Sequence, residues 1–534
     1  MMAERTWVAV ALACLVWFAY LKWFAPPPLS QQGTEAISKE ASAAKPAAAT
    51  GETSGGTAVV AKEPLRFDVA TEQSTNRLQL KVCSSGGRLC SIELQKYRQN
   101  IRHDANRISL VDGGNFSQSL STLFTDPELA SLGTGAYEIT PGKNRATATR
   151  RVNGYRLVKE FVWNEDSYVL QQKVRLERSN SGGEADKGYL EIPLGTKPMQ
   201  VDATQPLEAW EAVAFQNDTT QRKALGSQSD GQTILQGTTG WIAFGNRYFA
   251  TALVTARSPI NPDVVLVKRA DFEGVVARFP LRFKEGTKAL EFDLPIYAGP
   301  KEIAELSQVP GLKQIIDYGR LSFLAYPLLE LLRFFYRFVH NYGIAIILLT
   351  ITVRLIFYPL SARGARSMKA MQKLQPQVKV LQEKYKDDRA RLSQEQMALF
   401  KAHSVNPLGG CVPLLVQLPV FIALYTVLGN SIELFQAPFF LWVKDLSSRD
   451  PIYVFPVLMG IAMFLQQKMT PAVGMDPVQQ KMMMFMPLIF TFFMLNLPAG
   501  LNVYMFLSTI LGVLQQWAIN RDGTPTSAAA VVSS

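Results

Sequence analysis

A single arginine, Arg354, lies inside the apolar stretch Asn341–Leu360, which has the length and composition of a membrane-spanning helix. Thr350, Arg354 and Tyr358 follow one another four residues apart, so on a helix they form a polar line along one face. A charge inside a bilayer costs at least ~2.5 kcal/mol, which favours an arginine that faces protein or trapped water rather than lipid. The alternative is an arginine whose long side chain snorkels to the lipid headgroups.

Later apolar segments carry amide side chains that a lipid-facing helix does not need. They are Gln417, Gln466, Gln467, Asn502, Gln515 and Gln516. A single buried glutamine often serves only as a hydrogen bond between helices. Once orientation is assigned, however, Gln467, Gln515 and Gln516 fall on the same cytoplasmic side as the arginine, while the outer halves of the spans are more uniformly apolar. Together these residues predict a polar hollow that opens to the cytoplasm and is closed toward the outside.

The remaining chemistry-bearing residues form no catalytic pattern. The chain has four cysteines and three histidines (His103, His340 and His403), too few and too scattered for a Cys/His metal cluster. Residues 64–318 contain no G-x-S-x-G, no H-E-x-x-H and no phosphate-binding loop. The apolar segments lack the Ser/His pair, the two aspartates or the metal motif of an intramembrane protease. The sequence therefore predicts neither an enzyme nor a bound cofactor or metal.

Two compositional regimes divide the 534 residues. Short alternating runs such as Tyr155–Trp163 and Tyr168–Leu176, separated by Gly, Asn and Asp, predict a large antiparallel β-sandwich within residues 64–318. Residues 320–520 are far more apolar and predict a polytopic α-helical membrane region. Much of the net charge of +11 lies in segments that flank apolar spans, as the positive-inside bias requires, so we expect no direct nucleic-acid partner.

The chain begins with an apolar segment, residues 1–25, that we interpret as an uncleaved membrane anchor with its N-terminus in the cytoplasm. Residues 26–63 are rich in Pro, Ala, Ser, Thr and Gly and predict a flexible linker. The β domain would then lie in the periplasm, where it either binds a peptide or partner in a cleft or acts as a docking and spacing module. Its last segment, residues 301–318, is predicted to be a helical connector broken at Pro310-Gly311.

An amphipathic helix and a basic hairpin are predicted on either side of the Arg354 span. Glu330, Arg333 and Arg337 recur on one side of residues 319–340, which indicates a helix that lies on the outer membrane surface. Residues 361–411 are polar and basic and predict a cytoplasmic helical hairpin. Its turn is expected near residues 386–388, and its second helix is expected to begin after Ser393.

The whole membrane topology follows from these segments. One span is predicted at residues 341–360, four more occupy residues 412–520, and a short tail follows at residues 521–534. With the N-terminal anchor this gives six spans, five of them in the core, with both termini in the cytoplasm and residues 26–340 in the periplasm.

Cys83 and Cys90 flank the glycine turn of a predicted β-hairpin. A two-residue loop would place the cysteines opposite each other but would pair Leu80 with Glu93. A three-residue loop pairs Leu80 with Ile92 and puts the cysteines on opposite faces. The apolar pattern therefore favours the second register and disfavours a disulfide.

A polar hollow of half the membrane depth restricts the possible functions. A through-channel needs polar residues over the full depth, and a transporter usually shows internal repeats around a midplane site; the spans show neither pattern. A hollow with one positive charge suits instead a polar or acidic segment of another polypeptide, because it lowers the desolvation cost of that segment. A small-solute transporter or channel is the alternative, and a purely structural assembly partner is a third possibility.

Four runs of residues resemble the YidC membrane protein insertases of the Gram-negative type, within the YidC/Oxa/Alb family. They are Val353–Leu360, Asn406–Pro419, Asp445-Leu446 with Asp450-Pro451, and Gln479–Pro487. This resemblance covers residues 320–520, whereas the anchor and the β domain are similar to the family in architecture only.

The resemblance implies an insertase and folding chaperone that moves nascent membrane proteins from the cytoplasm into the inner membrane, alone or with the Sec translocon, without nucleotide. It implies that Arg354 is the charge of a substrate groove, with Thr350 and Gln417 near it and Tyr504 as a substrate contact. The basic hairpin would receive substrate, ribosome or signal recognition particle machinery. Met505 departs from the pattern, because the family has a second tyrosine there, and this puts an aromatic contact at that position in doubt.

Overall fold

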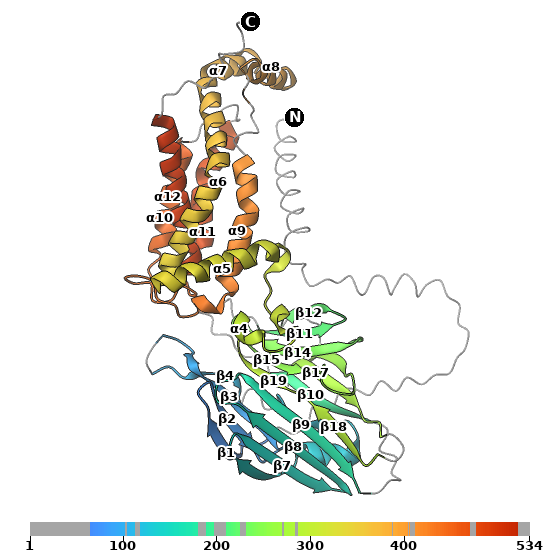
Figure 1. Ribbon diagram of the computed structural model, residues 1–534. Coiled ribbons are helices and arrows are strands. Elements are labelled where there is room, and N and C mark those ends of the chain that lie inside the picture. The colour runs from blue at the N-terminus through green and yellow to red at the C-terminus, as the bar shows by residue number, and fades with distance from the viewer. Residues whose placement is uncertain are drawn as a thin grey trace, which may run out of the picture. The chain divides into compact units, whose positions relative to one another are not determined.

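Figure 1 shows the computed structural model, in which the chain forms two compact units that divide after Asp317. The described residues are 65–521 without 102–103, 113–117, 180–187, 197–209, 225–230, 270–271, 284–286, 387, 404, 406–411 and 470–476. The predicted anchor at residues 1–25, the linker at 26–63 and all but the first residue of the tail lie outside these residues.

The first unit consists of antiparallel strands, which form three sheets among its described residues. The sheet orders are β1-β2-β3-β4, then β13-β16-β17-β10-β5, and a ten-stranded sheet β12-β11-β14-β15-β19-β9-β8-β7-β6 with β18 paired to β9. The strands are β1 Val69–Ser74, β2 Leu78–Cys83, β3 Arg88–Arg98, β4 Arg107–Val111, β5 Leu123–Phe124, β6 Glu138–Gly142, β7 Arg145–Val152, β8 Tyr155–Trp163, β9 Val169–Arg178, β10 Tyr189–Thr196, β11 Glu211–Gln216, β12 Thr219–Ala224, β13 Gly231–Leu235, β14 Thr239–Gly245, β15 Phe249–Val254, β16 Asp263–Lys268, β17 Glu273–Pro280, β18 Ala289–Asp293 and β19 Ile296–Pro300. A short helix, α3, spans Pro127–Thr134.

Two of these sheets pack face to face. Strand β14 of the ten-stranded sheet contacts β10, β16 and β17 of the five-stranded sheet. Trp241 and Phe244 on β14 and Phe279 on β17 are among the largest fully buried side chains of the chain. Trp241 and Phe244 lie three residues apart and so on opposite faces of β14, and burial of large aromatic rings contributes strongly to the stability of such a core. The predicted antiparallel β domain is therefore confirmed, with a four-stranded sheet in addition to the two facing sheets.

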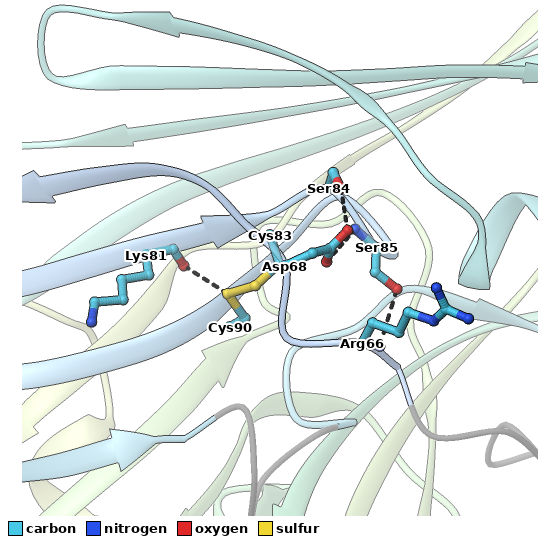
Figure 2. The surroundings of a disulfide bond; sticks show 7 residues. All are labelled: Arg66, Asp68, Lys81, Cys83, Ser84, Ser85 and Cys90. Carbon is cyan, nitrogen blue, oxygen red and sulfur yellow. Dashed lines mark hydrogen bonds between the residues drawn. A yellow bond between two sulfur atoms is a disulfide. The ribbon is translucent and has the colours of Figure 1, made fainter.

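Cys83 and Cys90 form a disulfide, so the expectation that the two cysteines stay unpaired is wrong (Figure 2). The predicted apolar register is present, because Leu80 pairs with Ile92. Immediately after Lys81, however, the register shifts and leaves Cys90 as an extra residue on β3. Such a β-bulge changes the face on which the following side chains lie, and this brings Cys90 beside Cys83.

The loop between the two cysteines, residues 84–87, is anchored by residues from outside the hairpin. The Asp68 carboxylate accepts a hydrogen bond from the Ser85 backbone N–H at 3.0 Å, as Figure 2 shows. On the other side, Lys159 of β8 donates to the Gly86 carbonyl at 2.7 Å. This loop therefore joins the four-stranded sheet, through β2 and β3, to the ten-stranded sheet, through β8.

Lys159 occupies a core position because the alternation along β8 buries it on the same face as Leu157 and Phe161. Its ammonium group lies 4.8 Å from the centroid of the Tyr137 ring. Burial, with a smaller contribution from the positive charge of Arg88, lowers the pKa of Lys159 to about 7. The fold therefore holds a lysine that is close to losing its proton at neutral pH.

Replacement of both Cys83 and Cys90 by serine should lower the free energy of unfolding of the β unit. The expected loss is about 2.5 kcal/mol, because the crosslink closes a loop of about eight residues and restricts the unfolded chain. Pulse proteolysis of the full chain in urea, with fragments of the β unit as the readout, measures this loss. An unchanged urea midpoint, together with cysteines that react with a thiol reagent in the absence of reductant, would contradict the disulfide.

The stability of the β unit should rise with pH between about 7 and 10.5. In this range folded Lys159, with its pKa of about 7, has released a proton that the unfolded lysine keeps up to the ordinary lysine pKa of 10.5. The unfolded state therefore binds more protons, and the free energy of unfolding increases as the pH rises. Below pH 7 the cost of burying the charge is fully present.

The Lys159→Met variant provides the control for this pH dependence. Urea midpoints from pulse proteolysis at about pH 6.5 and pH 8.5 should differ more in the wild type than in the variant, because only the wild type contains the titrating group. An equal difference in both proteins would show that other groups cause the pH dependence.

The connector at the end of the first unit packs on the β11–β12 hairpin. Helix α4 (Ile303–Leu306) and the 3₁₀-helix η2 (Leu312–Ile315) are separated by a break at Gly311, whose φ is 75°. Arg222 donates to the Ile315 carbonyl at 2.9 Å and pairs with Glu211 at 2.9 Å, and Glu211 also pairs with Lys301 at 3.2 Å. The connector therefore consists of two short helical segments on either side of Gly311, and charged side chains hold it in place.

The second unit is helical. Its elements are η3 Gly319–Leu321, α5 Ser322–Val339, α6 Tyr342–Lys373, α7 Gln375–Lys384, α8 Arg389–Ala402, α9 Val412–Asn430, η5 Ile432–Leu434, α10 Val454–Met469, α11 Pro477–Met494 and α12 Ala499–Arg521. Among the described residues, α6 is long and apolar enough to cross a membrane, and the shorter apolar helices are Gln417–Asn430, Val454–Met469 and Lys481–Met494. By length and composition, α6 is the described helix that meets the requirements of a membrane span, and the count of six spans stays a prediction.

Helix α5 lies crosswise to α6 and α9 and packs against both (Figure 1). Leu329 and Leu332 are buried, whereas Phe334 and Phe338 on other sides of the helix are exposed. Arg333, on the predicted polar side, pairs with Glu330 on the same helix and with Glu433 in η5. The predicted amphipathic helix is present, and an ion-pair network ties its polar side to the chain that follows α9.

The hairpin differs from its prediction in two places. Helix α6 does not end near Leu360 but continues to Lys373, so α7 and α8 form the hairpin. Helix α8 begins at Arg389 rather than after Ser393, because the Asp388 carboxylate caps its first turn. Asp388 is the stronger N-terminal signal because its side chain accepts from a free backbone N–H of the first turn, and the serine then lies inside the helix.

Candidate functional site

The start of helix α6 is held by contacts with the loop that follows α9. Asn341 caps the helix, since its Oδ1 accepts from the Ile344 N–H at 3.1 Å, and its Nδ2 donates to the Phe439 carbonyl at 3.0 Å. Gly343 lies against the Phe439 ring, where a Cβ atom would come within 1.8 Å. The start of α6 is therefore fixed against the loop after α9, and Arg354 follows about three turns further along the helix.

Arg354 reaches across to α12, where Ser508 holds its guanidinium group. Nε donates to Ser508 Oγ at 3.1 Å, and Nη2 donates to the same hydroxyl at 2.7 Å and to the Ser508 carbonyl at 2.6 Å. No carboxylate pairs with Arg354 among the described residues, and the charge is held by neutral polar atoms. The arginine faces protein, as expected from the cost of exposing a charge to lipid.

The predicted polar line along α6 is not continuous. Thr350 is fully buried, and its hydroxyl donates to the Ile346 carbonyl of its own helix at 2.6 Å. Tyr358 is 49% exposed. Of the three residues on this face, only Arg354 makes a side-chain contact with another helix in the hydrogen bonds among the described residues.

A second predicted pair joins α9 to α12. Gln417 Nε2 donates to the Tyr504 hydroxyl at 3.2 Å, and Tyr504 is 2% exposed. Tyr504 lies one turn before Ser508 on α12. The Gln417–Tyr504 pair and the Arg354–Ser508 pair are therefore neighbours along α12 and connect it to α9 and α6.

The other three predicted glutamines lie nearer the C-terminal ends of their helices. Gln515 Nε2 donates to the Ser361 hydroxyl at 2.8 Å, and Gln516 Nε2 donates to the Met469 carbonyl at 2.9 Å. The Oε1 atom of Gln467 is buried and has no hydrogen-bond partner. Gln515 and Gln516 link α12 to α6 and α10, as interhelical hydrogen bonds do, and they do not contact Arg354.

Ser508 was missed in the sequence because a lone serine in an apolar run gives no strong signal. A weak signal exists on α12, where Tyr504, Ser508, Gly512 and Gln515 follow at intervals of four, four and three residues and so share one face. Gly512 leaves space on this face, because a Cβ atom there would lie only 3.2 Å from Gln466 Nε2 and 3.6 Å from Arg354 Nη2.

Burial changes along α12 at the level of Ser508. Residues 499–504 are all buried, whereas none of residues 510–518 is buried. On α6 the pattern is similar, since residues 355–361 that follow Arg354 contain no buried residue. The charged contact therefore marks the boundary between a closely packed end of the helix pair and a more open end.

A loop with a buried aspartate covers the closely packed end. Asp450 is fully buried and accepts hydrogen bonds from Trp442 Nε1 at 3.1 Å and from the Phe455 N–H at 2.8 Å, at the start of α10. The Ala499 N–H, at the start of α12, donates to the Ser448 carbonyl of this loop at 2.7 Å. The loop therefore fixes the starts of two helices at once.

A separate pocket of about 660 Å³ lies in the β unit. Its polar lining residues are Asn144, Asn164, Ser167, Gln171, Arg257 and Gln308, and Trp163 forms part of the apolar lining. Its lining contains no Asp, Glu, His or Cys, and the described residues contain no group of three such side chains that could hold a metal ion. Amide side chains can bind polar groups through hydrogen bonds but provide no acid–base pair for a reaction.

The Asp450→Ala variant should destabilise the helical unit by about 2–3 kcal/mol, because it removes a helix cap and leaves buried N–H groups without an acceptor. Thermal unfolding of the full chain in detergent, followed by tryptophan fluorescence, measures this effect. Asp450→Asn keeps one acceptor oxygen and should lie between the wild type and the alanine variant. Equal unfolding temperatures for all three proteins would contradict the capping role.

These features define a class, namely a membrane protein with a helical unit that holds one charge between its helices, preceded by a large antiparallel β domain. Two family profiles match the chain in the same order. One, described as the YidC periplasmic domain, matches residues 72–331, and the other, described as the 60Kd inner membrane protein, matches residues 334–526.

Curated relatives match over nearly the whole chain. A membrane protein insertase YidC from Geotalea daltonii is 34% identical over 97% of this chain and 99% of its own length. Proteins of the same name from Geobacter metallireducens and Methylobacillus flagellatus are 35% and 32% identical, over 97% and 95% of this chain and 98% and 94% of their own lengths. A crystal structure of an active YidC insertase covers 84% of this chain and 92% of its own, with 18% identity and a TM-score of 0.38.

The chain therefore belongs to the YidC family of membrane protein insertases. It is an inner-membrane protein with a periplasmic domain, and its function is insertion of nascent membrane proteins into the lipid bilayer rather than catalysis of a chemical reaction.

Proposed function

We propose that the more open end of the helical unit is a substrate groove that receives a polar or acidic segment of a nascent membrane protein. Its proposed residues are Arg354, Thr350, Gln417, Gln467, Tyr504, Gln515 and Gln516. The observation that carries the proposal is the Arg354 charge, which only neutral atoms of Ser508 hold among the described residues. A charge without a carboxylate partner remains available to an acidic ligand.

Each proposed residue has a place in this groove. Arg354 supplies the attraction, and Gln417 with Tyr504 supplies polar atoms on the adjoining helices. Thr350 lies on the buried side of Arg354, where it forms part of the closed floor. The three cytoplasmic-side glutamines line the entrance, because their amides can exchange an interhelical hydrogen bond for one to a polypeptide.

The groove would lower the free-energy cost of removing water from the polar end of a client segment. The polar end of a client segment would enter part of the way across the bilayer, where Arg354 and the amides replace its lost water. The apolar part of the segment would then move sideways into lipid, because burial of apolar surface there is favourable. Attraction, rather than covalent chemistry or nucleotide hydrolysis, would drive this step.

The proposed orientation places both termini in the cytoplasm and residues 26–340 in the periplasm, with six spans in total. The long apolar α6 and the shorter apolar helices of the same unit support it. In this orientation the basic hairpin α7–α8 is cytoplasmic, as the positive-inside bias requires. The closely packed end with Asp450 then faces the periplasm, so the groove would open only toward the cytoplasm.

We also propose that the protein acts alone or beside the Sec translocon. The basic surface of α7–α8, which includes Lys379, Lys384 and Lys401, supports contact with the ribosome or signal recognition particle machinery during delivery. A small-solute channel is less well supported, because residues 499–504 of α12 are all buried.

The Arg354→Ala variant should weaken insertion of clients that have acidic outer segments, and should affect clients with neutral outer segments much less. Site-specific crosslinking from Thr350, Gln417 and Tyr504 to a stalled nascent membrane protein measures client occupancy of the groove. In the wild type, we expect crosslinks from all three positions. For acidic clients they should fall severalfold in the variant, because the favourable charge interaction is lost.

Arg354→Lys is the matched control, because it keeps a positive charge but not the guanidinium. It should preserve part of the acidic-client crosslinking. A wild type that gives no crosslinks from any of the three positions would mean that clients pass elsewhere and that the polar residues only connect helices. Ion flux through vesicles that contain the purified protein would favour a channel.

A further inference from the structure

We propose that Ser508 is a positioning residue, which fixes the guanidinium of Arg354 so that one edge of it faces the groove and pairs with acidic client segments. This inference rests on the proposed function of Arg354. Ser508 would not contact the client, and it would act on the client only through the arginine.

The hydrogen bonds between Arg354 and Ser508 fix the orientation of the guanidinium group. Both Nε and Nη2 donate to Ser508, the first to the hydroxyl at 3.1 Å and the second to the hydroxyl at 2.7 Å and the carbonyl at 2.6 Å. Because the guanidinium is planar and its donors have a fixed fork geometry, two nitrogens held on one residue determine the direction of the third.

The third nitrogen, Nη1, is left for another partner. None of the hydrogen bonds from Arg354 to the described residues uses it. A Cβ atom added at Gly512 would lie 3.8 Å from Nη1 and 3.2 Å from Gln466 Nε2, so Gly512 itself does not cover Nη1, and the side chain nearest to that position is an amide. Beyond Thr509 the residues of α12 are not buried until Ile519, which places this nitrogen at the edge of the more open end.

Ser508 behaves differently from the other hydroxyl residues of these helices. Thr350 and Thr509 donate their hydroxyl hydrogens to carbonyls one turn earlier on their own helices, at 2.6 Å and 2.8 Å. This is the usual arrangement for Ser and Thr in a helix. The Ser508 hydroxyl instead accepts two hydrogen bonds from Arg354, and it is 7% exposed. The contact is therefore specific to Arg354 and is not a general consequence of burying a hydroxyl.

If the contact between Arg354 and Ser508 only held α6 and α12 together, a different result would be expected. Loss of such a contact would loosen the helix pair and reduce insertion of every client alike. A positioning role predicts an effect that depends on the charge of the client and on the presence of Arg354. The two roles can therefore be separated with paired clients.

The experiment uses the full chain in membrane vesicles and two clients that differ only in an acidic or neutral outer segment. Ser508→Ala should reduce insertion of the acidic client by about fivefold, because a hydrogen bond to a charged group is lost. Insertion of the neutral client should change by less than about twofold. Ser508→Thr keeps the hydroxyl and should restore the acidic client, and in an Arg354→Ala background Ser508→Ala should cause no further loss.

Thr509→Val is the matched control, because it removes a neighbouring hydroxyl of similar exposure, 8%, that bonds only its own helix. It should leave both clients unchanged. A second readout does not depend on insertion: mass spectrometry can follow the modification of Arg354 by a membrane-permeant dicarbonyl reagent that reacts with guanidinium groups. Ser508→Ala should make this modification several times faster, because the guanidinium is released, and Thr509→Val should not.

Equal losses for the two clients in Ser508→Ala, or an unchanged rate of Arg354 modification, would overturn the positioning role. If Arg354→Ala impairs the acidic client while Ser508→Ala changes neither insertion nor reactivity, only the positioning role fails. If Arg354→Ala itself leaves the acidic client unaffected, the proposed function fails, and the effect of Ser508 on client choice fails with it.

Discussion

A guanidinium group inside an apolar helical unit must find polar atoms within hydrogen-bond distance, because it stays charged and lipid cannot solvate it. Here this requirement is met by one residue of α12, whose hydroxyl and carbonyl both accept from Arg354. Close approach of α6 and α12 is therefore part of the site. The caps at Asn341 and Asp450 fix the starts of the helices that carry and surround the charge, so that a bond of 2.6–3.1 Å can form between residues 154 positions apart.

The need of the Arg354 charge for polar partners also explains why the site is closely packed on one side and open on the other. Neutral dipoles stabilise a charge less than a carboxylate does, so the arginine keeps much of its capacity to attract an anion. Full burial of such an incompletely paired charge would be costly. The packing along α12 avoids that cost, since residues 499–504 are buried and residues 510–518 are not. Placement of the charge at this boundary lets water or a client complete its solvation from one side, while the loop around Asp450 covers the other side.

The sequence predicted the features that follow from the apolar alternation of a strand or from the free-energy cost of a charge in an apolar helix. It missed the features that depend on a single local contact. The cost of a charge in an apolar helix singled out Arg354, and alternation predicted the pairing of Leu80 with Ile92. The bulge that brings Cys90 beside Cys83 leaves no trace in the apolar pattern, because an inserted residue changes the register only locally. Ser508 was missed for a similar reason, since one hydroxyl in an apolar run looks the same whether it bonds its own helix or an arginine.

Comparison of Lys159 with Arg354 shows why the groove needs an arginine. Burial, with a smaller contribution from the positive charge of Arg88, lowers the pKa of Lys159 in the β unit to about 7, so a buried lysine can lose its proton near neutral pH. A lysine placed between α6 and α12 would also lose part of its hydration, which favours the neutral amine, so it would attract an acidic segment less strongly than an arginine does. An arginine keeps its charge under such conditions and offers donors on two edges. One edge can then be held by the protein while the other remains free, which a lysine with a single nitrogen does not allow.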